Sequence, residues 1–433
     1  MKPPVPKSPH QASQLVQIEK PIYGGAFLAR SEGKAIFVPL ALPGEQARVR
    51  VIEDKRGYAS AEVAEIVTPA PERTTAVCRH FGACGGCDYQ HADYGAQLRF
   101  KEAVLRETLE RGGVRAPDEI AVLTAEPWGY RNRIRLAFDA TGSPGYRSRR
   151  SHAVIPIAEC PISAPLLVRA GLAAAQIARS YPAALRQAEI SLFCDAQETA
   201  LLAGIHTIDA GKLPFDSFCR TLDATIPELK GAQHTAEGRF GRPLRTLAEY
   251  GDHSLAYRAA GFDYRVDHGA FFQVNRWLVD ALVDAVTNGQ KGALAWDLFA
   301  GVGLFARQLA ARFTRAVAVE SAPSATAALA HNLNGTGACA VKASTLEFLR
   351  RERSGERPDL IVVDPPRTGL GADATTLLAD VKAPALVYVS CDPATLARDL
   401  RALVASGYGI EKITLADLFP QTFHLETIVH LRR

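Results

Sequence analysis

The chain has 433 residues, a length that at roughly 150 residues per domain suggests two or three domains and excludes a single small module. Hydrophobic residues make up 47% and charged residues 22%, which is typical of folded proteins and argues against wholesale disorder. With 50 Lys and Arg against 46 Asp and Glu, the net charge of +4 does not by itself indicate a polyanionic partner. No stretch reaches about 18 consecutive apolar residues, so the sequence predicts a soluble, cytoplasmic protein that makes no use of a membrane.

The N-terminal part, residues 14–69, consists of short runs in which polar and apolar side chains alternate. Clear examples are 47–51 and 61–66, and Gly or Pro turns separate the runs. Alternation with a period of two residues is typical of strands that have one buried face. The pattern therefore predicts a small β-barrel over 14–69.

The segment 70–265 mixes strand-like pieces with Ala-rich helix, which predicts an α+β middle domain. The runs 134–138 and 189–194 have the pattern of strands, and 166–179 has that of a helix. A further helix, predicted over 94–112, is counted in this segment, although it can also pack on the domain that follows.

Residues 266–433 show apolar strand runs that alternate with amphipathic helices. The strand runs are 293–299, 316–320, 360–364 and 385–390, and two further strands close the chain at 410–415 and 427–431. This alternation predicts an α/β, Rossmann-like domain with a mostly parallel sheet. In such sheets, ligands bind outside the carboxyl ends of the strands.

A glycine-containing loop follows the first of these runs. Asp297 lies at the end of the strand, and Gly301 and Gly303 precede a helix, so the backbone can approach a ligand closely and offer amide donors. Glu320, at the end of the next strand, is placed to accept hydrogen bonds from a ribose diol. The third glycine of a dinucleotide fingerprint is missing, which favours S-adenosylmethionine. A tight turn without a ligand is the alternative.

Two further motifs follow later strands of the same predicted sheet. Asp364 precedes two prolines and Arg367, and Cys391 follows the 385–390 run. Both should emerge at the edge that carries the glycine loop. A reactive thiol needs a helix N-terminus or a cation to lower its pKa from about 8.5, and the helix predicted from near residue 393 offers the former. A proline-terminated strand and an inert thiol are the alternatives.

The combination of these motifs carries a resemblance to a known family, through the segments 271–275, 297–303, 364–367, 390–393 and 419–426. In this combination the chain resembles the S-adenosylmethionine-dependent RNA 5-methyluridine methyltransferases. Its cysteines and leading barrel further resemble the branch that acts on 23S ribosomal RNA, in which the barrel is an OB-like TRAM domain. The resemblance spans nearly the whole chain and implies methylation of carbon 5 of a specific uridine, with 23S rRNA as the expected partner.

The resemblance also implies roles for individual residues. Cys391 would add to carbon 6 of uracil as the nucleophile, and Glu426 would remove the carbon 5 proton as the base. Together with the glycine loop, the expected cofactor-binding residues are Gln273, Phe299, Glu320, Asp364, Asp297, Gly301 and Gly303. Leu304 departs from a close relative in which a polar residue at the matching position touches the cofactor.

Four cysteines are placed as candidate metal ligands: Cys78, Cys84, Cys87 and Cys160. Their spacing alone suits either zinc or a 4Fe-4S cluster. Gly85 and Gly86 between two of them, and Pro161 after the last, favour iron and sulfur. The family resemblance implies a 4Fe-4S cluster with a structural or RNA-positioning role.

A basic patch is hidden by the small net charge. Arginines gather in two short segments, and the candidates for RNA contact are Arg131, Arg133, Arg147, Arg149 and Arg150. Arginine pairs with phosphate bidentately, and nearby aromatic rings can stack on unpaired bases. A solvated strand face is the alternative.

Three rival functions remain open from the sequence. Relatives with similar features differ in target, so 5-methyluridine formation in tRNA is one. Methylation of an exocyclic amine is another, because residues 364–366 resemble the Asp-Pro-Pro loop of adenine and glutamine methyltransferases, although Arg367 replaces the aromatic residue of that loop. The third is a non-catalytic, cluster-containing RNA-binding factor. No obligate protein partner is expected.

Overall fold

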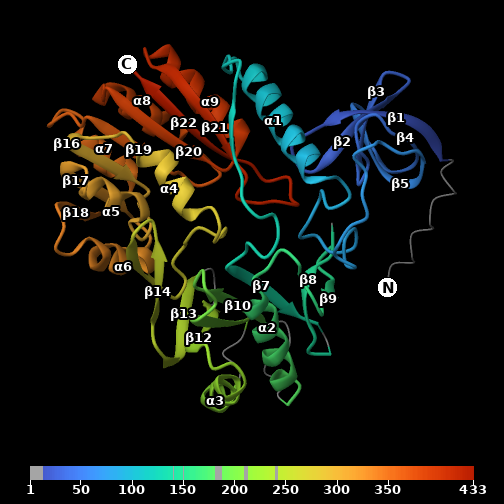
Figure 1. Ribbon diagram of the computed structural model, residues 1–433, viewed down its shortest axis with the longest axis horizontal. Coiled ribbons are helices and arrows are strands. Elements are labelled where there is room, and N and C mark those ends of the chain that lie inside the picture. The colour runs from blue at the N-terminus through green and yellow to red at the C-terminus, as the bar shows by residue number, and fades with distance from the viewer. Residues whose placement is uncertain (1–12, 140, 150, 181–187, 209–212, 239–241) are drawn as a thin grey trace. The chain divides into compact units, whose positions relative to one another are not determined.

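The computed structural model describes residues 13–139, 141–149, 151–180, 188–208, 213–238 and 242–433 (Figure 1). The chain divides into two compact units. The first comprises residues 1–105 together with 421–424, and the second comprises 106–420 together with 425–433. The division falls inside α1 (Tyr94–Arg111), so this helix contributes residues to both units.

The first unit contains a closed β-barrel, as the alternating pattern predicted. Its strands follow one another in the spatial order β1-β2-β3-β5-β4, and β1 pairs with β4 to close the barrel. Their bounds are β1 Gln14–Pro21, β2 Ala26–Ser31, β3 Lys34–Pro39, β4 Gln46–Asp54 and β5 Tyr58–Thr68.

The barrel core is apolar except for one carboxylate. Alternate strand residues such as Ile18 point inward and are buried. Glu45 is also fully buried, and its carboxylate accepts hydrogen bonds from the amides of Leu42 (2.8 Å) and Ala70 (3.2 Å) and from the Arg73 guanidinium (2.8 Å). These hydrogen bonds compensate for the burial of the carboxylate. Two of the donors, Ala70 and Arg73, lie just after β5, so Glu45 also attaches the barrel to the segment that follows it.

The short segment 421–424 belongs to this first unit although it comes from the C-terminal part of the sequence. The Gln421 amide donates to the side-chain oxygen of Gln97 in α1 (3.0 Å), and the Gln97 side chain donates back to that of Gln421 (3.0 Å). The Gln421 carbonyl accepts from the amides of Asp88 and Tyr89. These bonds hold Gln421 at a φ of 69°, a region that non-glycine residues rarely adopt.

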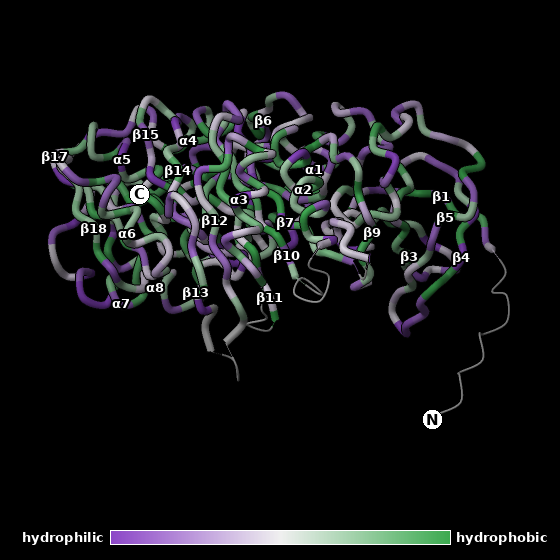
Figure 2. The backbone as a smooth tube through the Cα atoms, turned by 90° about the horizontal axis from the view of Figure 1, so that it is seen from below, coloured by the Kyte–Doolittle hydropathy of each residue, from purple (hydrophilic) through white to green (hydrophobic). Residues whose placement is uncertain are grey.

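The middle part of the second unit is a mixed sheet with α2 and α3 against one face. Strand order is β13-β12-β11-β10-β7-β8-β9. Leu192 and Ile205 of the sheet share a core cluster with Leu167 of α2 and Phe218 of α3. The bounds are β7 Arg133–Phe138, β8 Pro144–Arg147, β9 Val154–Pro156, α2 Pro165–Ala178, β10 Glu189–Cys194, β11 Leu201–Thr207, α3 Phe215–Thr225, β12 Leu229–Gly238 and β13 Arg242–Gly251. Figure 2 shows hydrophobic stretches along β7, β10 and β11.

The C-terminal part of the second unit is built on a largely parallel sheet in the order β18-β17-β16-β19-β20-β22-β21-β6. A hairpin of β14 (Ser254–Ala259) and β15 (Phe262–Asp267) precedes it. The sheet strands are β6 Ala121–Leu123, β16 Gly292–Leu298, β17 Phe313–Glu320, β18 Ala338–Lys342, β19 Leu360–Val363, β20 Ala385–Ser390, β21 Gly409–Ala416 and β22 Glu426–Arg432.

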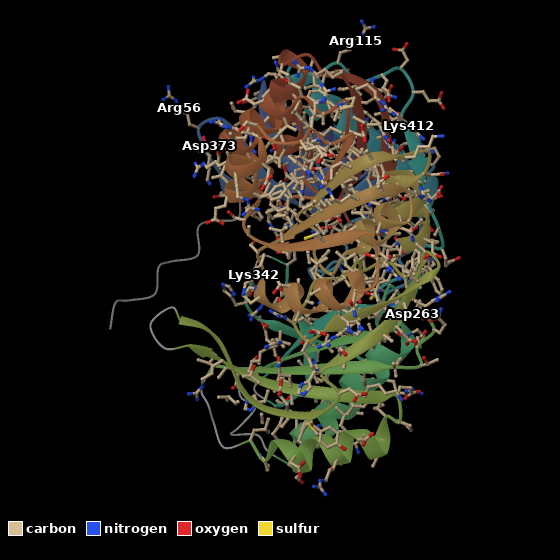
Figure 3. The ribbon with its side chains drawn as sticks, turned by 90° about the vertical axis from the view of Figure 1, so that its left-hand side faces the viewer. Arg56, Arg115, Asp263, Lys342, Asp373 and Lys412 are labelled. Atoms are coloured by element: carbon tan, nitrogen blue, oxygen red, sulfur yellow. The ribbon has the colours of Figure 1, made fainter. Side chains whose placement is uncertain are left out.

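Helices cover both faces of this sheet because its strands are apolar on both sides. Ala295 of β16 packs in a cluster with Leu282 of α4 and Leu309 of α5, whereas the next residue, Trp296, contacts the ring of Phe348 in α7 edge-on. The helices are α4 Val279–Thr287, α5 Leu304–Ala310, α6 Pro323–Leu333, α7 Thr345–Glu352, α8 Gly371–Val381 and α9 Pro393–Ala405. Figure 3 shows charged side chains such as Asp373, Lys342 and Lys412 pointing outward.

The predicted α/β domain and N-terminal barrel are thus confirmed, and some strands were missed. No apolar run in the sequence indicated β18, because it is an edge strand whose residues are half-buried or exposed. The prediction therefore passed directly from β17 to β19. Among the helices in the described ranges, none has the length and apolarity needed to cross a bilayer.

Candidate active site

Three neighbouring strands of the largely parallel sheet, which we call the catalytic sheet, end at the same edge. Each strand ends close to a residue that the sequence analysis identified as a candidate. Asp297 is the penultimate residue of β16, Asp364 follows β19, and Cys391 follows β20. These strands run parallel, so their carboxyl ends lie together. The chain passes from β16 outward to β18 and then returns to β19 on the other side, which makes this edge the switch point where open α/β sheets bind ligands.

Glu426 reaches the same edge because β22 runs antiparallel to β20. It is the first residue of β22, and the pairing of Ser390 with Thr427 aligns the start of β22 with the end of β20. The structure thereby brings the carboxyl group of Glu426 beside the turn that carries Cys391.

Burial disfavours the ionised forms of the carboxyl groups at this edge. Loss of hydration, with a smaller contribution from the charge of Asp364, raises the pKa of Asp297 to about 8. Burial likewise raises the pKa of Asp364 to about 7. The pKa of Glu426 lies well above its ordinary value because Glu426 is buried and Asp364 is close, while the charge of Arg367 opposes this rise. Within the described residues, neither carboxylate oxygen of Asp297 completes a hydrogen bond of normal geometry.

The thiol of Cys391 is held in its protonated form in this state. Desolvation raises its pKa to about 11, the charges of Glu426 and Asp364 add to the rise, and Arg367 lowers it. The free protein therefore holds very little thiolate at neutral pH.

The helix expected to activate this thiol has its N-terminus occupied by another residue. Asp392 is the N-cap of α9, and its carboxylate accepts hydrogen bonds from the amides of Ala394 (3.1 Å) and Thr395 (2.9 Å). Asp392 takes up these donors, and desolvation raises the pKa of Cys391, so the expectation that its pKa is lowered is wrong for the protein without ligands.

The glycine loop has the tight backbone that its sequence predicted. Phe299, Gly301 and Gly303 all have positive φ, of 66°, 56° and 92°. A Cβ on Gly303 would come within 2.9 Å of the side chain of Leu329, so only glycine fits there. Phe299 carries the cost of a left-handed conformation in a non-glycine residue, which is often found at functional sites.

Glu320 fastens the glycine loop to the end of β17. One of its carboxylate oxygens accepts from the amide of Gly301 (2.9 Å), and the other accepts from the amides of Ser321 and Ala322 (both 2.6 Å). A carboxylate has about four acceptor positions, so one remains for a ligand hydroxyl.

Gln273 lies in the segment between β15 and α4. It is buried, and its backbone carbonyl accepts a hydrogen bond from the side chain of Asn132 (2.9 Å). Leu304, at the start of α5, is also buried and offers no polar side chain.

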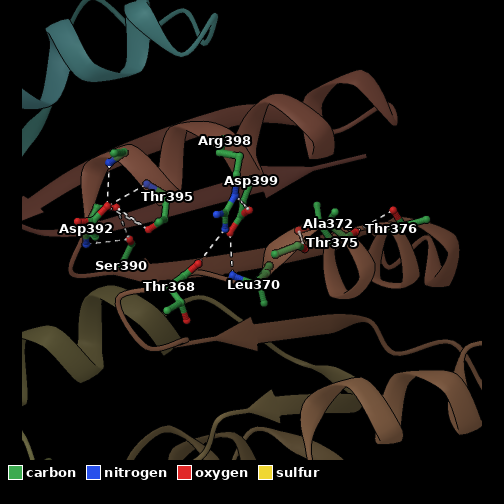
Figure 4. A network of polar contacts seen from close by, with 12 residues as sticks. Thr368, Leu370, Ala372, Thr375, Thr376, Ser390, Asp392, Thr395, Arg398 and Asp399 are labelled. Carbon is green, nitrogen blue, oxygen red and sulfur yellow. Dashed lines mark hydrogen bonds and ion pairs between the residues drawn. The ribbon is translucent and has the colours of Figure 1, made fainter.

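α9 holds the loop that follows β19, in which Figure 4 shows Thr368 and Leu370 facing Arg398 and Asp399. The Thr395 hydroxyl donates to the carbonyl of Arg367 (3.1 Å), and one turn further along the helix the Arg398 guanidinium donates to the carbonyl of Thr368 (2.9 Å). The turn containing Cys391 and the loop containing Asp364 are therefore tied to each other through one helix.

Asp399 completes this attachment from a buried position. It is 2% exposed, and its carboxylate accepts from the Leu370 amide (2.8 Å), the Tyr388 hydroxyl (2.8 Å) and the Arg398 guanidinium (2.9 Å). Sequence reasoning missed this residue. Its signal was an acidic side chain on the apolar face of α9, between Leu396 and Leu400, because a charge placed there needs bonded partners.

We expect Asp399→Ala to lower the free energy of unfolding by about 2–3 kcal/mol, because the substitution leaves buried donors without an acceptor. Thr376→Val is the matched control, since that hydroxyl donates only locally, to the carbonyl of Ala372 on an exposed face of α8. Thermal denaturation of both variants would test this, and equal, small effects would contradict it.

The cysteine segment of the first unit is an irregular loop. The Cys84 amide donates to the carbonyl of His80 (2.8 Å), and the Gly86 amide points at the Cys84 sulfur (3.4 Å). Cys78 and Cys84 are half-buried and Cys87 is buried. Cys160 lies in the second unit, where the Ser163 hydroxyl donates to its sulfur (3.1 Å). In the ranges described above, no group of three or more Cys, His, Asp or Glu side chains is arranged to hold a metal ion.

The four arginines of the predicted patch that the structure describes do not form one open surface. The Arg133 guanidinium stacks on the ring of Phe193 (4.3 Å) and donates to the carbonyl of Ala270 (2.7 Å), and desolvation lowers its pKa to about 10. Arg147 is exposed and pairs with Glu189 (2.9 Å). Arg131 and Arg149 are half-buried, and Arg150 lies outside the described residues.

Known proteins resemble this chain along most of its length. The family model for tRNA (uracil-5-)-methyltransferases matches residues 354–433, and that for the TRAM domain matches 10–64. The solved structure of the Pyrococcus abyssi tRNA (uracil-54, C5)-methyltransferase in complex with S-adenosyl-L-homocysteine aligns with a TM-score of 0.77 at 24% identity, covering 96% of this chain and 100% of the other. This likeness shows a shared fold.

Proteins related in sequence are more similar to this chain than the Pyrococcus enzyme is. The 23S rRNA (uracil(1939)-C(5))-methyltransferase RlmD of Chromohalobacter salexigens is 34% identical over 96% of this chain and 89% of its own. An uncharacterized RNA methyltransferase of Streptomyces avermitilis is 34% identical over 96% and 97%. Identity at this level over nearly the full length of both proteins shows that this chain belongs to the TRAM-containing family of RNA (uracil-5-)-methyltransferases.

Proposed function

We propose that this protein transfers a methyl group from S-adenosylmethionine to carbon 5 of a uridine in 23S ribosomal RNA. The observation that carries the proposal is the register of β20 and β22, which brings the thiol of Cys391 beside the carboxyl group of Glu426 at a buried sheet edge. The choice of 23S rRNA follows the names of relatives such as the Chromohalobacter enzyme.

The two side chains account for the steps that this reaction needs. Carbon 5 of uracil is a weak nucleophile. It gains enolate character when the Cys391 thiol gives up its proton to solvent and the resulting thiolate forms a bond to carbon 6. Carbon 5 then takes up the methyl group. Glu426 accepts the proton that carbon 5 still carries, the electron pair of that bond re-forms the double bond, and the Cys391 thiolate leaves.

The residues at the sheet edge fit a cationic nucleoside cofactor. Asp297 and Asp364 are buried carboxyl groups with raised pKa values, and a positive charge beside them would restore their ionised forms. Glu320 would use its remaining acceptor position for a ribose hydroxyl, and Gln273 and Phe299 would line the same site. When bound, S-adenosylmethionine would supply an electrophilic methyl group.

Methyl transfer to defined RNA pools tests the proposal. The substrates are 23S rRNA and, separately, tRNA from cells that lack this protein, each incubated with enzyme and S-adenosylmethionine labelled in its methyl group. We expect labelled 5-methyluridine in the 23S digest. Label in tRNA alone would move the substrate to tRNA, and label on an exocyclic amine would replace the carbon 5 reaction.

We further propose that Cys78, Cys84, Cys87 and Cys160 hold a 4Fe-4S cluster. The support is chemical: four thiols are available, and two of their sulfurs, those of Cys84 and Cys160, accept hydrogen bonds of the kind that tune iron-sulfur ligands.

Anaerobic purification followed by iron, sulfide and zinc analysis tests this assignment. We expect about four iron and four sulfide per chain, with a brown colour that Cys84→Ser abolishes. Cys339→Ser is the matched control because that cysteine is exposed and far along the sequence from the four. Colourless protein with stoichiometric zinc would contradict the proposal.

For RNA contact we retain Arg131, Arg147, Arg149 and Arg150 as proposed phosphate-binding residues. Arg133 is withdrawn because its guanidinium is engaged by Phe193 and by a backbone carbonyl.

A further inference from the structure

An exposed tryptophan stands in the segment that joins β15 to α4. Trp277 is 43% exposed, although tryptophan is on average among the more buried residues. It lies four positions after Gln273 and six after Phe271, which is 61% exposed. Two large aromatic side chains thus face solvent on either side of the residue expected to bind the cofactor.

The ring of Trp277 is held rigidly. Its indole N–H donates to the backbone carbonyl of Trp128 (3.1 Å), and its amide donates to the side chain of Asn275 (3.0 Å). The guanidinium of Arg276 lies 4.1 Å from the ring centroid. A fixed ring loses little conformational entropy when a ligand stacks on it.

Arg276 acts as a support for the ring and is not available to a ligand itself. Its side chain is 6% exposed, and its donors are used by the carbonyls of Gly129 (2.8 Å) and Ala196 (3.1 Å) and by the carboxylate of Glu198 (2.6 Å). A buried arginine with several hydrogen bonds thus lies over the ring of a tryptophan that is 43% exposed.

The segment around Trp277 is anchored to both parts of the second unit. The Asn275 side chain donates to the carbonyl of Leu418 (3.2 Å), in the loop that leads towards Glu426, and the Asn275 backbone pairs with that of Arg131. The segment that carries Trp277 is therefore tied, through Asn275, both to the loop after β21 and to the segment proposed to contact RNA.

From these contacts we infer that Trp277 is a stacking surface for an unpaired base of the substrate RNA, close to the target uridine. The inference rests on the proposed function, which requires an RNA with an accessible uridine. An aromatic face accepts any base, and its stacking contributes to the affinity for single-stranded RNA without reading sequence. The arginine behind the ring adds a cation–π contact that keeps the ring in place.

Binding to matched RNAs tests the inference. The probes are a 23S fragment that contains the modified loop and a fully paired duplex of the same length. We expect Trp277→Ala to bind the loop about 5- to 100-fold more weakly, to bind the duplex as wild type does, and to keep the wild-type salt dependence, because no phosphate contact is removed. Trp277→Phe should retain most of the affinity. Val404→Ala, which removes a similarly exposed apolar side chain from α9, is the control.

Tryptophan fluorescence gives a second reading that does not depend on the alanine variant folding. The loop RNA should quench wild-type emission, and Trp277→Phe should lose that part of the quenching. Unchanged loop affinity together with unchanged quenching would overturn the inference, as would an equal loss on loop and duplex. If wild type methylates RNA and Trp277→Ala binds the loop RNA normally, this inference alone is overturned. If wild type methylates no RNA, the proposed function is overturned.

Discussion

Replacing Cys391 with alanine is expected to remove methyl transfer almost completely, with a loss of about 10⁴-fold or more, because carbon 5 of uracil does not react without the nucleophile at carbon 6. The direct test of the nucleophile uses RNA that contains 5-fluorouridine. Fluorine cannot leave as a proton, so the wild-type enzyme should accumulate a protein–RNA adduct that survives denaturation. Cys391→Ala should form none.

Cys339→Ala is the matched control, since that thiol is exposed and lies on β18, away from the carboxyl ends of β19 and β20. It should form the adduct as wild type does. An adduct formed equally by Cys391→Ala would show that another group attacks the uracil. If no adduct forms with wild type while natural RNA accepts methyl groups, direct transfer to an amine becomes the better account.

The raised pKa of Cys391 also predicts how the reactivity of its thiol changes with pH. A thiol with a pKa of about 11 is protonated at pH 7, so alkylation of the free enzyme at Cys391 should accelerate about tenfold per pH unit and show no plateau below about pH 10. Mass spectrometry of the modified peptide measures this rate. A plateau near pH 8 would mean that the thiol is already activated before any ligand binds.

Sequence reasoning predicted that the proposed reaction groups share one sheet edge, but it did not predict their pKa values. Asp297, Asp364 and Cys391 could be assigned to one sheet edge because each follows an apolar run, and parallel strands end together. The raised pKa values could not be predicted, because they arise from burial and from the mutual approach of carboxyl groups that are far apart in the sequence.

Arg133 shows that the sequence also did not predict which partner a side chain meets in the folded protein. From the sequence it was one of several arginines in a basic segment, and nothing local distinguished it from Arg147. The structure separates them by partner, because Arg133 stacks on Phe193 whereas Arg147 remains exposed beside Glu189. Arg133 lies opposite Phe193 in the pairing of β7 with β10, whereas Arg147 is the last residue of β8, and these pairings are a property of the folded sheet.

Glu426→Gln is expected to stop the reaction after the methyl group has arrived. Glutamine cannot accept the carbon 5 proton, so the thiolate cannot be expelled, and free product should form about 10²- to 10⁴-fold more slowly. With natural RNA and S-adenosylmethionine, a denaturation-stable adduct that already carries the new methyl group should accumulate. The fold should persist, because the raised pKa of Glu426 means that its neutral form, which glutamine resembles, already occupies this buried position.

The same raised pKa would suit Glu426 to the proposed role of base. The charge of a sulfonium cofactor would favour the ionised form of Glu426 before transfer. Without that charge, burial would again give the carboxylate a high affinity for a proton, as release of the carbon 5 proton requires. Glu411→Gln, an exposed change on the adjacent β21, is the control and should turn over normally. Loss of product without an adduct would assign Glu426 to a step before methyl transfer, and normal turnover would assign the base to another residue.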